Sequence, residues 1–347
     1  MRTRCGLLGV MLVLGARAGA QTSAKPHADW EWGAEVELSY DDNVFLYSDA
    51  DIAAFEAGAS PDRFGFASVG DFCLTTELSA EKPVRRQGKS RTDLEAEVRS
   101  RLYLRDSEAN QFRVRLGVQH LLDQRHWVRL KATYLPDYHV RRLYDRESAT
   151  WAPAEFDYAA LAVTYWQRFS REWAADVDLS WERRDYNRGF NERDANDWVG
   201  SVRARYSPDK RWDAWLGLDV RRSSARASDG LPGVDPDVSN TELSSTLGAR
   251  CQLTPVDRVQ AEWEGSRQRY TTGLQPAEDP YHSGRRDHES TVRLQYRRAL
   301  DRDRALTLEW EHATSRSHLP AHPGTFPRDE SLDYDRDRIG LSYSTQF

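Results

Sequence analysis

The feature that most constrains this chain is a repeated alternation of apolar and polar residues. Between Trp173 and Glu182 the odd positions are Trp, Ala, Val, Leu and Trp, while the even positions include Asp176 and Asp178. Neighbouring side chains of a β-strand point to opposite faces of a sheet, so a period of two predicts a strand with one apolar and one polar face. We expect about fourteen such strands, at 30–40, 66–78, 94–104, 112–119, 128–134, 161–165, 173–182, 198–206, 214–221, 243–253, 259–263, 292–296, 306–310 and 336–347.

The connections between these strands alternate in length. Short turns follow the even-numbered strands, for example at 122–125 and 254–257, and longer polar loops follow the odd-numbered ones, at 41–65, 136–155, 187–195, 227–239, 270–287 and 313–333. Antiparallel strands that rise to one side and return to the other produce this alternation. Residues 82–91 form a longer turn, and residues 105–110 a shorter loop, than the alternation of short and long connections predicts. The number of strands near the N-terminus can therefore differ by one from this assignment.

The composition favours a sheet with one apolar face and one face in contact with water. The chain has 12 Trp, 15 Tyr and 11 Phe, yet 30% of its residues are charged. Beyond the N-terminus, no apolar run reaches the roughly 20 residues of a transmembrane helix. The formal charge of −6 argues against a nucleic-acid partner, which requires a basic footprint. Only Cys73 and Cys251 follow residue 20, which excludes a disulfide-stapled scaffold.

The N-terminus predicts export. Arg2 and Arg4 precede an apolar run at 7–14, and Ala18-Gly-Ala20 fits the small-residue pattern of a cleavage site. We therefore expect a cleaved signal peptide at 1–20, a short N-terminal segment at 21–29 and a barrel at 30–347. Because residues 1–20 hold three arginines and no acid, their removal changes the formal charge from −6 to −9.

The last stretch, 336–347, connects this pattern with a known family. Ile339, Leu341, Tyr343 and Phe347 share one parity, and the chain ends on the aromatic residue. The stretch resembles the C-terminal assembly signal of bacterial outer-membrane β-barrel proteins. The resemblance implies an all-β, transmembrane, antiparallel up-and-down β-barrel of about 14 strands in the outer membrane of a Gram-negative cell. It also implies contact with outer-membrane lipid, and recognition by the barrel assembly machinery through Tyr343 and Phe347.

Aromatic residues gather at the expected periplasmic ends of the strands. Such a position suits an interfacial girdle, because the rings are amphipathic and lie at headgroup depth. The residues concerned are Trp127, Tyr165, Trp166, Trp173, Tyr206, Trp212 and Phe347.

The polar faces define an expected lumen with two charged walls. The basic wall consists of Arg99, Arg101, Arg113, Arg115, Arg129 and Lys131, and the acidic wall of Glu31, Glu35, Glu37, Glu262, Glu264, Glu309 and Glu311. One interpretation is cross-strand charge pairing, worth a few tenths of a kcal/mol per pair. The other is a transverse field that aligns dipolar solutes in a narrow pore. We expect Arg293 and Arg297 to pair with the acidic strands, and Arg203 and Arg205 with Asp176, Asp178 and Asp219.

Motifs for chemistry are nearly absent, and we expect no enzyme, cofactor or metal site. The sequence has no GxSxG, HExxH, P-loop or Cys pair at metal spacing. Tyr281-His282-Ser283-Gly284 resembles an element of outer-membrane phospholipases but lacks its Asn and its order. The acidic residues at 41–51 and 229–237 suit Ca²⁺ by ligand type, but without EF-hand spacing they are interpreted as solvated loop acids.

These observations predict a passive, porin-like diffusion channel for small hydrophilic solutes. Barrels of about eight strands are filled by side chains and those of 16–18 leave an open channel, so about fourteen predicts a narrow pore. In strand count the barrel resembles monomeric fourteen-stranded porins. The alternative is an accessory barrel for exopolysaccharide export, or for binding a surface glycan or partner through outer loops such as 41–65 and 270–287. That alternative draws on Tyr40-Asp-Asp-Asn-Val44, which resembles a segment of barrels encoded near exopolysaccharide genes.

Overall fold

The computed structural model describes residues 30–145, 148–226, 237–275, 279, 281–319 and 333–347. The predicted signal peptide at 1–20 and the segment at 21–29 lie outside the described residues, as do parts of the expected loops at 136–155, 227–239, 270–287 and 313–333.

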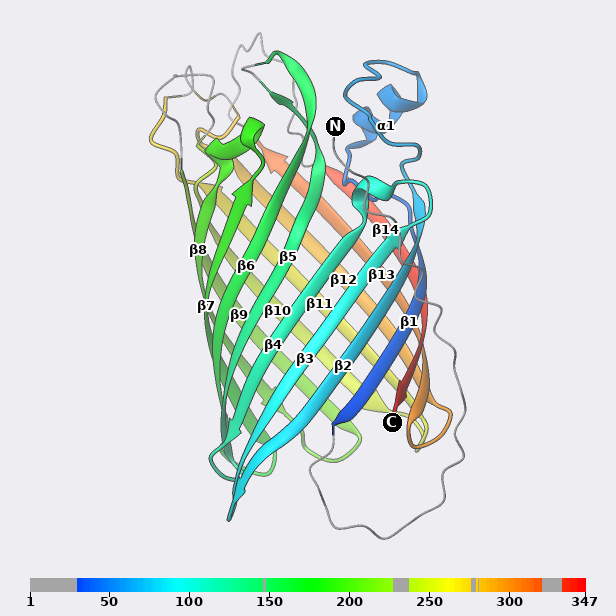
Figure 1. The fold of residues 1–347 in the computed structure, drawn as a ribbon, viewed down its shortest axis with the longest axis vertical. Coiled ribbons are helices and arrows are strands. Elements are labelled where there is room, and N and C mark those ends of the chain that lie inside the picture. The colour runs from blue at the N-terminus through cyan, green and yellow to red at the C-terminus, as the bar shows by residue number, and fades with distance from the viewer. Residues whose placement is uncertain (1–29, 146–147, 227–236, 276–278, 280, 320–332) are drawn as a thin grey trace.

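The described residues form a closed barrel of fourteen strands (Figure 1). Each strand pairs antiparallel with its neighbours in the chain, and the first strand pairs with the last. The predicted all-β antiparallel barrel of about fourteen strands is confirmed. Its strands are β1 (Glu31–Asp41), β2 (Asp71–Gln87), β3 (Ser90–Tyr103), β4 (Gln111–Leu121), β5 (His126–Asp145), β6 (Thr150–Arg168), β7 (Trp173–Tyr186), β8 (Ala195–Tyr206), β9 (Trp212–Ala225), β10 (Asn240–Gln252), β11 (Asp257–Tyr270), β12 (Arg286–Ala299), β13 (Arg304–His318) and β14 (Tyr334–Gln346).

Several strands run further than the alternation predicted. Residues 82–91 are not a long turn, because β2 and β3 meet at the two-residue turn Gly88-Lys89, where Gly88 adopts a positive φ of 61°. Likewise, most of the expected loop at 136–155 is a hairpin of β5 and β6. The register of this hairpin shifts between Leu135 and Tyr138 and again shortly after. Each bulge breaks the period of two without ending the strand, and Asp137 in the first bulge has a positive φ of 47°. The sequence pattern therefore stopped before the strand did.

Three of the connections at the end of the barrel opposite the short turns contain short helices. The loop at 41–65 includes the helix α1 (Asp49–Glu56), the loop at 105–110 includes the 3₁₀ turn η1 (Ser107–Ala109), and the loop at 187–195 includes η2 (Arg188–Arg193). Figure 1 shows these connections at one end of the barrel and the short turns at the other, where the C-terminus also lies. Within the described residues, no helix is both long enough and apolar enough to cross a membrane.

Outward-facing aromatic residues mark the height of the apolar band. Three strands each carry two of them eight positions apart, with small or apolar outward residues between them: Trp32 and Tyr40 on β1, Trp173 and Trp181 on β7, and Trp198 and Tyr206 on β8. The β7–β8 register places Trp173 opposite Tyr206 and Trp181 opposite Trp198. A tilted transmembrane strand needs about 9–11 residues, so the two aromatic rows lie about one bilayer core apart.

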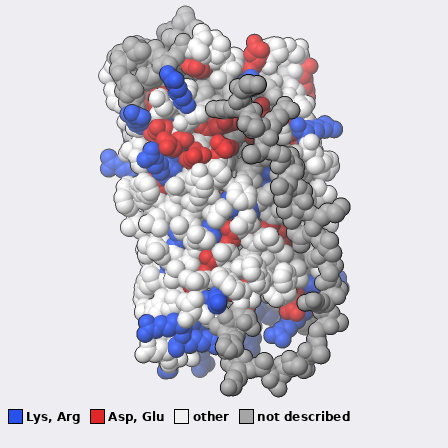
Figure 2. All heavy atoms as spheres, in the orientation of Figure 1, with Lys and Arg blue, Asp and Glu red and all other residues white. Residues whose placement is uncertain are grey.

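Charges avoid much of this band on the face that Figure 2 shows. Lys and Arg gather at the lower end of that face, Asp and Glu gather near its upper end together with further Lys and Arg, and most of the surface between carries neither. The large outward side chains are exposed, with Leu38, Leu179 and Leu247 more than half accessible. A surface of this kind is suited to lipid rather than to water.

Two of the expected girdle residues face the lumen instead. Trp127 and Trp166 lie opposite each other across β5 and β6, with ring centroids 5.9 Å apart. They share the parity of the lumen residue Arg129, while the outward positions beside them are Val128 and Tyr165. Position near a strand end suggested a girdle for these two tryptophans, but their parity decides their face.

The seam between β1 and β14 ends in a pair of backbone hydrogen bonds. The Trp32 N–H donates to the Phe347 carbonyl at 3.0 Å, and the Phe347 N–H donates to the Trp32 carbonyl at 2.9 Å. The Phe347 ring points outward and is 74% exposed. Phe347 therefore contributes both the last bonded pair of the seam and an aromatic side chain at the lipid-facing rim.

We predict that deletion of Phe347 lowers the amount of folded barrel in the outer membrane several-fold. An unpaired strand edge cannot face lipid, and the deletion removes the last bonded pair of the closing seam. Heat-modifiable gel mobility of the outer-membrane fraction measures the folded barrel. Gln346→Ala, which keeps the backbone, is the control and should assemble normally. A deletion variant at normal levels would contradict the prediction.

Candidate functional site

The inward faces of the strands bring together the predicted charged residues. The six basic wall residues lie on the lumen parity of β3, β4 and β5, and the seven acidic ones on that of β1, β11 and β13. A cavity of about 530 Å³ lies between the two sets, lined by Arg99, Arg101 and Arg113 on one side. The other side is lined by Glu35, Glu37, Glu309 and Glu311 together with Arg293, Arg336 and Arg338. Further cavities of about 670 Å³ and 390 Å³ lie towards the short-turn end.

The basic wall contains carboxylates of its own. Glu97 on β3 accepts a hydrogen bond from Arg113 at 2.8 Å and forms a second ion pair with Arg115 at 3.2 Å. Glu95 pairs with Arg129 at 3.1 Å. The predicted wall omitted both acids, although they share its parity and directly precede Arg99 and Arg101 on the same face of β3.

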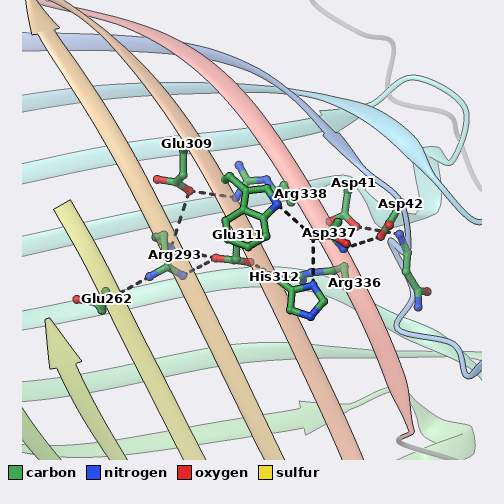
Figure 3. Close-up of polar contacts among 12 residues, drawn as sticks. Asp41, Asp42, Glu262, Arg293, Glu309, Glu311, His312, Arg336, Asp337 and Arg338 are labelled. Carbon is green, nitrogen blue, oxygen red and sulfur yellow. Dashed lines mark hydrogen bonds and ion pairs between the residues drawn. The ribbon is translucent and has the colours of Figure 1, made fainter. Parts of the chain in front are cut away.

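The acidic wall likewise contains guanidinium groups (Figure 3). Arg293 on β12 lies between two acidic strands and pairs with Glu262 at 3.0 Å and with Glu311 at 2.5 Å. The predicted pairing of Arg293 is therefore confirmed. Arg336 and Arg338 on β14 were not predicted, and they pair with Glu311 and Glu37 respectively.

A glycine makes room for one of these pairs. Gly340 on β14 faces the lumen beside Glu37, and a Cβ atom at this position would lie 2.7 Å from the Glu37 Oε1 atom. The missing side chain lets the Glu37 carboxylate lie against the wall and reach Arg338. This is a close approach that only glycine permits without a shift of the carboxylate.

A third network lies on the other side of the barrel. Arg221 on β9 pairs with Glu182 at 2.8 Å and with Asp197 at 2.9 Å, and Asp197 also binds Arg184 at 2.9 Å. Towards the short-turn end of the barrel, Arg205 lies 3.8 Å from Asp176, as predicted. Cross-strand pairs therefore occur on several sides of the lumen.

Some wall charges lie outside these pairs. Within the described part of the chain, Glu35, Glu264 and Lys131 take part in no ion pair. Paired charges partly cancel each other at a distance, whereas single charges act on a passing ion in full. The field across the lumen consequently depends on fewer residues than the two walls contain.

A folded cap stands beside the outer mouth. Residues 42–70, including α1, enclose an aromatic cluster in which Phe45, Tyr47 and Phe64 are buried and Phe55 and Phe66 are partly buried. The Phe55 and Phe66 ring centroids are 4.5 Å apart. The sequence predicted only a polar loop here, because the aromatic residues are scattered and follow no period.

The segment Tyr40–Val44 fastens this cap to the barrel. The buried Asn43 side chain accepts a hydrogen bond from the Tyr47 N–H at 2.8 Å and donates to the Tyr47 carbonyl at 2.8 Å and to the Asp335 carbonyl at 3.1 Å. Asp42 accepts from the Asp337 N–H at 2.8 Å. Figure 3 shows Asp41 and Asp42 beside Asp337 at the end of the seam.

His139 lies where the cap meets the β5–β6 hairpin, outside the apolar band. Its ring is an edge contact of Phe45, with centroids 5.8 Å apart. Its Nδ1 atom is 3.6 Å from Glu155 and its Nε2 atom 4.0 Å from Glu108. Burial lowers the pKa of His139, and this effect exceeds that of the Glu108 and Glu155 carboxylates, which raise it. The closed cap thus favours the neutral imidazole.

The other residues singled out in the sequence have structural partners or lie outside the described residues. His282 is buried in the β11–β12 connection, with Nδ1 2.9 Å from Asp279, and Asp51 pairs with Arg63 at 2.6 Å. Asp229 and Asp235 lie outside the described residues. Within the described ranges, no group of three or more His, Cys, Asp or Glu side chains is arranged to hold a metal ion.

Comparisons with known proteins agree with this architecture. No protein-family model matches the chain, and no curated protein matches it significantly. Among solved structures, the outer membrane channel DcaP of Acinetobacter baumannii is similar over 92% of this chain and 96% of its own, with a TM-score of 0.50 and 9% identity. The fold is that of a bacterial outer-membrane β-barrel.

Two more solved structures are similar at lower TM-scores. An anion-selective porin from Comamonas acidovorans matches 92% of this chain and 99% of its own, with a TM-score of 0.48 and 11% identity. A bacterial polysaccharide outer membrane secretin matches 90% of this chain and 98% of its own, with a TM-score of 0.46 and 10% identity. At such identities the likeness describes the outer-membrane β-barrel fold alone.

We predict that Asn43→Ala loosens the cap by about 1–3 kcal/mol, because it removes the side-chain partners of the buried Tyr47 N–H and carbonyl groups and of the part-buried Asp335 carbonyl. Hydrogen exchange across residues 44–56 should accelerate, while β7 and β8 stay protected. Asn43→Asp is the matched control: it keeps the acceptor for the Tyr47 N–H, loses both donors and should have an intermediate effect. Unchanged exchange in Asn43→Ala would contradict the proposed clasp.

We also predict that acid weakens the cap. Since the pKa of His139 is lower in the closed cap than its unfolded value of about 6.5, the open form binds more protons in the interval between the two values. Stability of the closed cap should therefore fall as the pH drops through this interval, and hydrogen exchange of residues 44–56, measured on both sides of it, should accelerate. In His139→Gln this added pH dependence should disappear. An equal acid effect in both proteins would assign the titration to another group.

Proposed function

We propose that this outer-membrane β-barrel is a passive diffusion channel for small hydrophilic solutes. One observation carries the proposal: the lumen is lined with charged side chains and contains cavities of about 670, 530 and 390 Å³. Burial of so many charges is costly in a dry interior, so this lining fits a lumen that holds water.

In this proposal, the wall residues select solutes by charge. Arg99, Arg101 and Arg113 present guanidinium groups to the cavity that the Glu35, Glu37, Glu309 and Glu311 carboxylates line from the other side. The ion pairs within each wall hold the long side chains against the barrel and leave space between the walls. A solute that carries both a positive and a negative group would interact with both walls at once, as the predicted transverse field requires.

The alternative role in polysaccharide export receives less support. The segment Tyr40–Val44, on which its resemblance rests, uses Asp41, Asp42 and Asn43 for hydrogen bonds within the protein. The aromatic residues of the cap pack mostly against one another. Both features account for these residues by stability of the cap, without a bound glycan.

Planar-bilayer recordings of the refolded protein test the channel. We expect discrete openings, and we expect Arg113→Ala combined with Arg115→Ala to shift the reversal potential towards cation selectivity. The double variant removes two positive charges and leaves Glu97 without its partners. Glu97→Gln should shift the potential in the opposite direction.

Arg85→Ala combined with Arg86→Ala is the matched control. It removes the same charge from the exposed end of the β2–β3 hairpin, where both side chains point into solvent, and should leave selectivity unchanged. Absence of discrete openings, or an unchanged reversal potential in the lumen variant, would reject the proposed channel.

A further inference from the structure

Four arginines on the outside of the barrel form a cluster above the apolar band. Each is exposed and has the same parity as outward apolar residues of its strand, so its side chain points away from the lumen. They are Arg222 on β9, Arg267 and Arg269 on β11, and Arg286 on β12.

The sheet register places these arginines on a common patch. Arg269 lies directly opposite Arg286, and Arg267 lies directly opposite His288, which in turn lies opposite Arg316 on β13. Thr241 on β10 connects Arg269 with Arg222, being opposite both. Residues directly opposite in a sheet have Cβ atoms about 4.5–5.5 Å apart, so Arg269 and Arg286 are immediate neighbours. Arg267 lies two positions along the same strand from Arg269, and Arg222 lies one strand further away, beyond Thr241.

Their surroundings differ from those of paired lumen arginines such as Arg113 and Arg293. In the described part of the chain, Arg222, Arg267, Arg269 and Arg286 take part in no ion pair with a carboxylate. At the edge of the patch, Arg316 pairs with Asp335 at 2.9 Å. The acids of the adjoining strands, Glu242, Asp287 and Glu289, have the opposite parity. Like charges directly opposite one another destabilise a sheet. An anion bound to this patch would reduce the repulsion between the arginines.

The patch is continuous with the lipid-facing surface. Arg267 lies directly opposite Leu243, which is 55% exposed, and Arg222 lies directly opposite Trp198, which is 56% exposed. Leu243 belongs to the apolar band and Trp198 to its upper aromatic row. An occupant that reaches both surfaces needs an anionic head and an apolar tail.

We propose that this patch binds the phosphate groups of a phosphorylated glycolipid in the outer leaflet of the membrane. Guanidinium groups form paired, charge-assisted hydrogen bonds with phosphate oxygens, and neighbouring arginines span two phosphates of one headgroup. The acyl chains then lie against the band below. The proposal rests on the orientation in which the longer connections face outward, and it is independent of conduction through the lumen.

The test uses diphosphorylated lipid A, added to the purified full-length barrel in neutral detergent, with native mass spectrometry as the readout. We expect stoichiometric binding to the unmodified protein, and at least tenfold weaker binding to a variant with Arg267→Gln, Arg269→Gln and Arg286→Gln. Lipid A without phosphates should bind at least tenfold more weakly to the unmodified protein. The Lys substitutions at the same three positions should retain part of the affinity, because they keep the charge but lose the paired geometry.

The matched control carries Arg85→Gln, Arg86→Gln and Lys89→Gln on the β2–β3 hairpin, which removes three charges at the other end of the barrel. It should bind lipid A as the unmodified protein does. Conductance of the same proteins separates the two proposals, since the patch variant should conduct normally if the lumen is a channel.

Two results would overturn the lipid site. One is equal binding of the phosphorylated and dephosphorylated lipid by the unmodified protein, an outcome that requires no variant to fold. The other is complete competition by inorganic phosphate at concentrations near the lipid's own dissociation constant, which would assign the patch to free phosphate.

Discussion

The structure depends on closure of one sheet. A strand edge exposes unpaired N–H and C=O groups, and hydrocarbon offers them no partner, so a sheet in a membrane must close on itself. Here closure is made by pairing β1 with β14 from Gly33 opposite Gln346 to Asp41 opposite Arg338. Backbone hydrogen bonds at Phe347 extend this seam at one end. At the other end, the Asp42 N–H donates to the Asp337 carbonyl and the Asp337 N–H donates to the Asp42 carboxylate.

Closure also brings many charged side chains together inside the barrel, where ion pairs partly neutralise them. Fourteen strands turn one polar face inward, and its charged residues face one another across a limited space. The ion pairs at Glu97, Arg293 and Arg221 each join strands that are neighbours or next neighbours, so they stiffen the wall while they neutralise it. Because partly exposed pairs of this kind contribute little stability individually, their main effect in the proposed channel is to hold long side chains away from its centre.

The outer face follows a different rule. Its apolar band requires only that apolar residues alternate along strands long enough to cross the membrane. The aromatic residues Trp32, Tyr40, Trp198 and Tyr206 mark its two borders. Above the upper border, charges need no partner from the same chain, because water and headgroups are available. The cations at Arg267, Arg269 and Arg286, which form no ion pair in the described part of the chain, belong to this region. In the proposed lipid site they interact with headgroups outside the barrel and have no role in the lumen.

The sequence by itself indicated about fourteen strands and the inward or outward parity of their residues, because a period of two is a local property that each strand repeats. The tertiary structure decided most of the partners, including those of Glu97, Arg336 and Arg338. Register places Glu97 directly opposite Arg115 and diagonal to Arg113, and bulges extend the β5–β6 hairpin beyond the visible pattern. The cap likewise has no periodic signal, since Phe45, Tyr47 and Phe64 are brought together by the folded loop. Alternation specifies a face for each residue, whereas contacts depend on register and on loop packing, which no local pattern encodes.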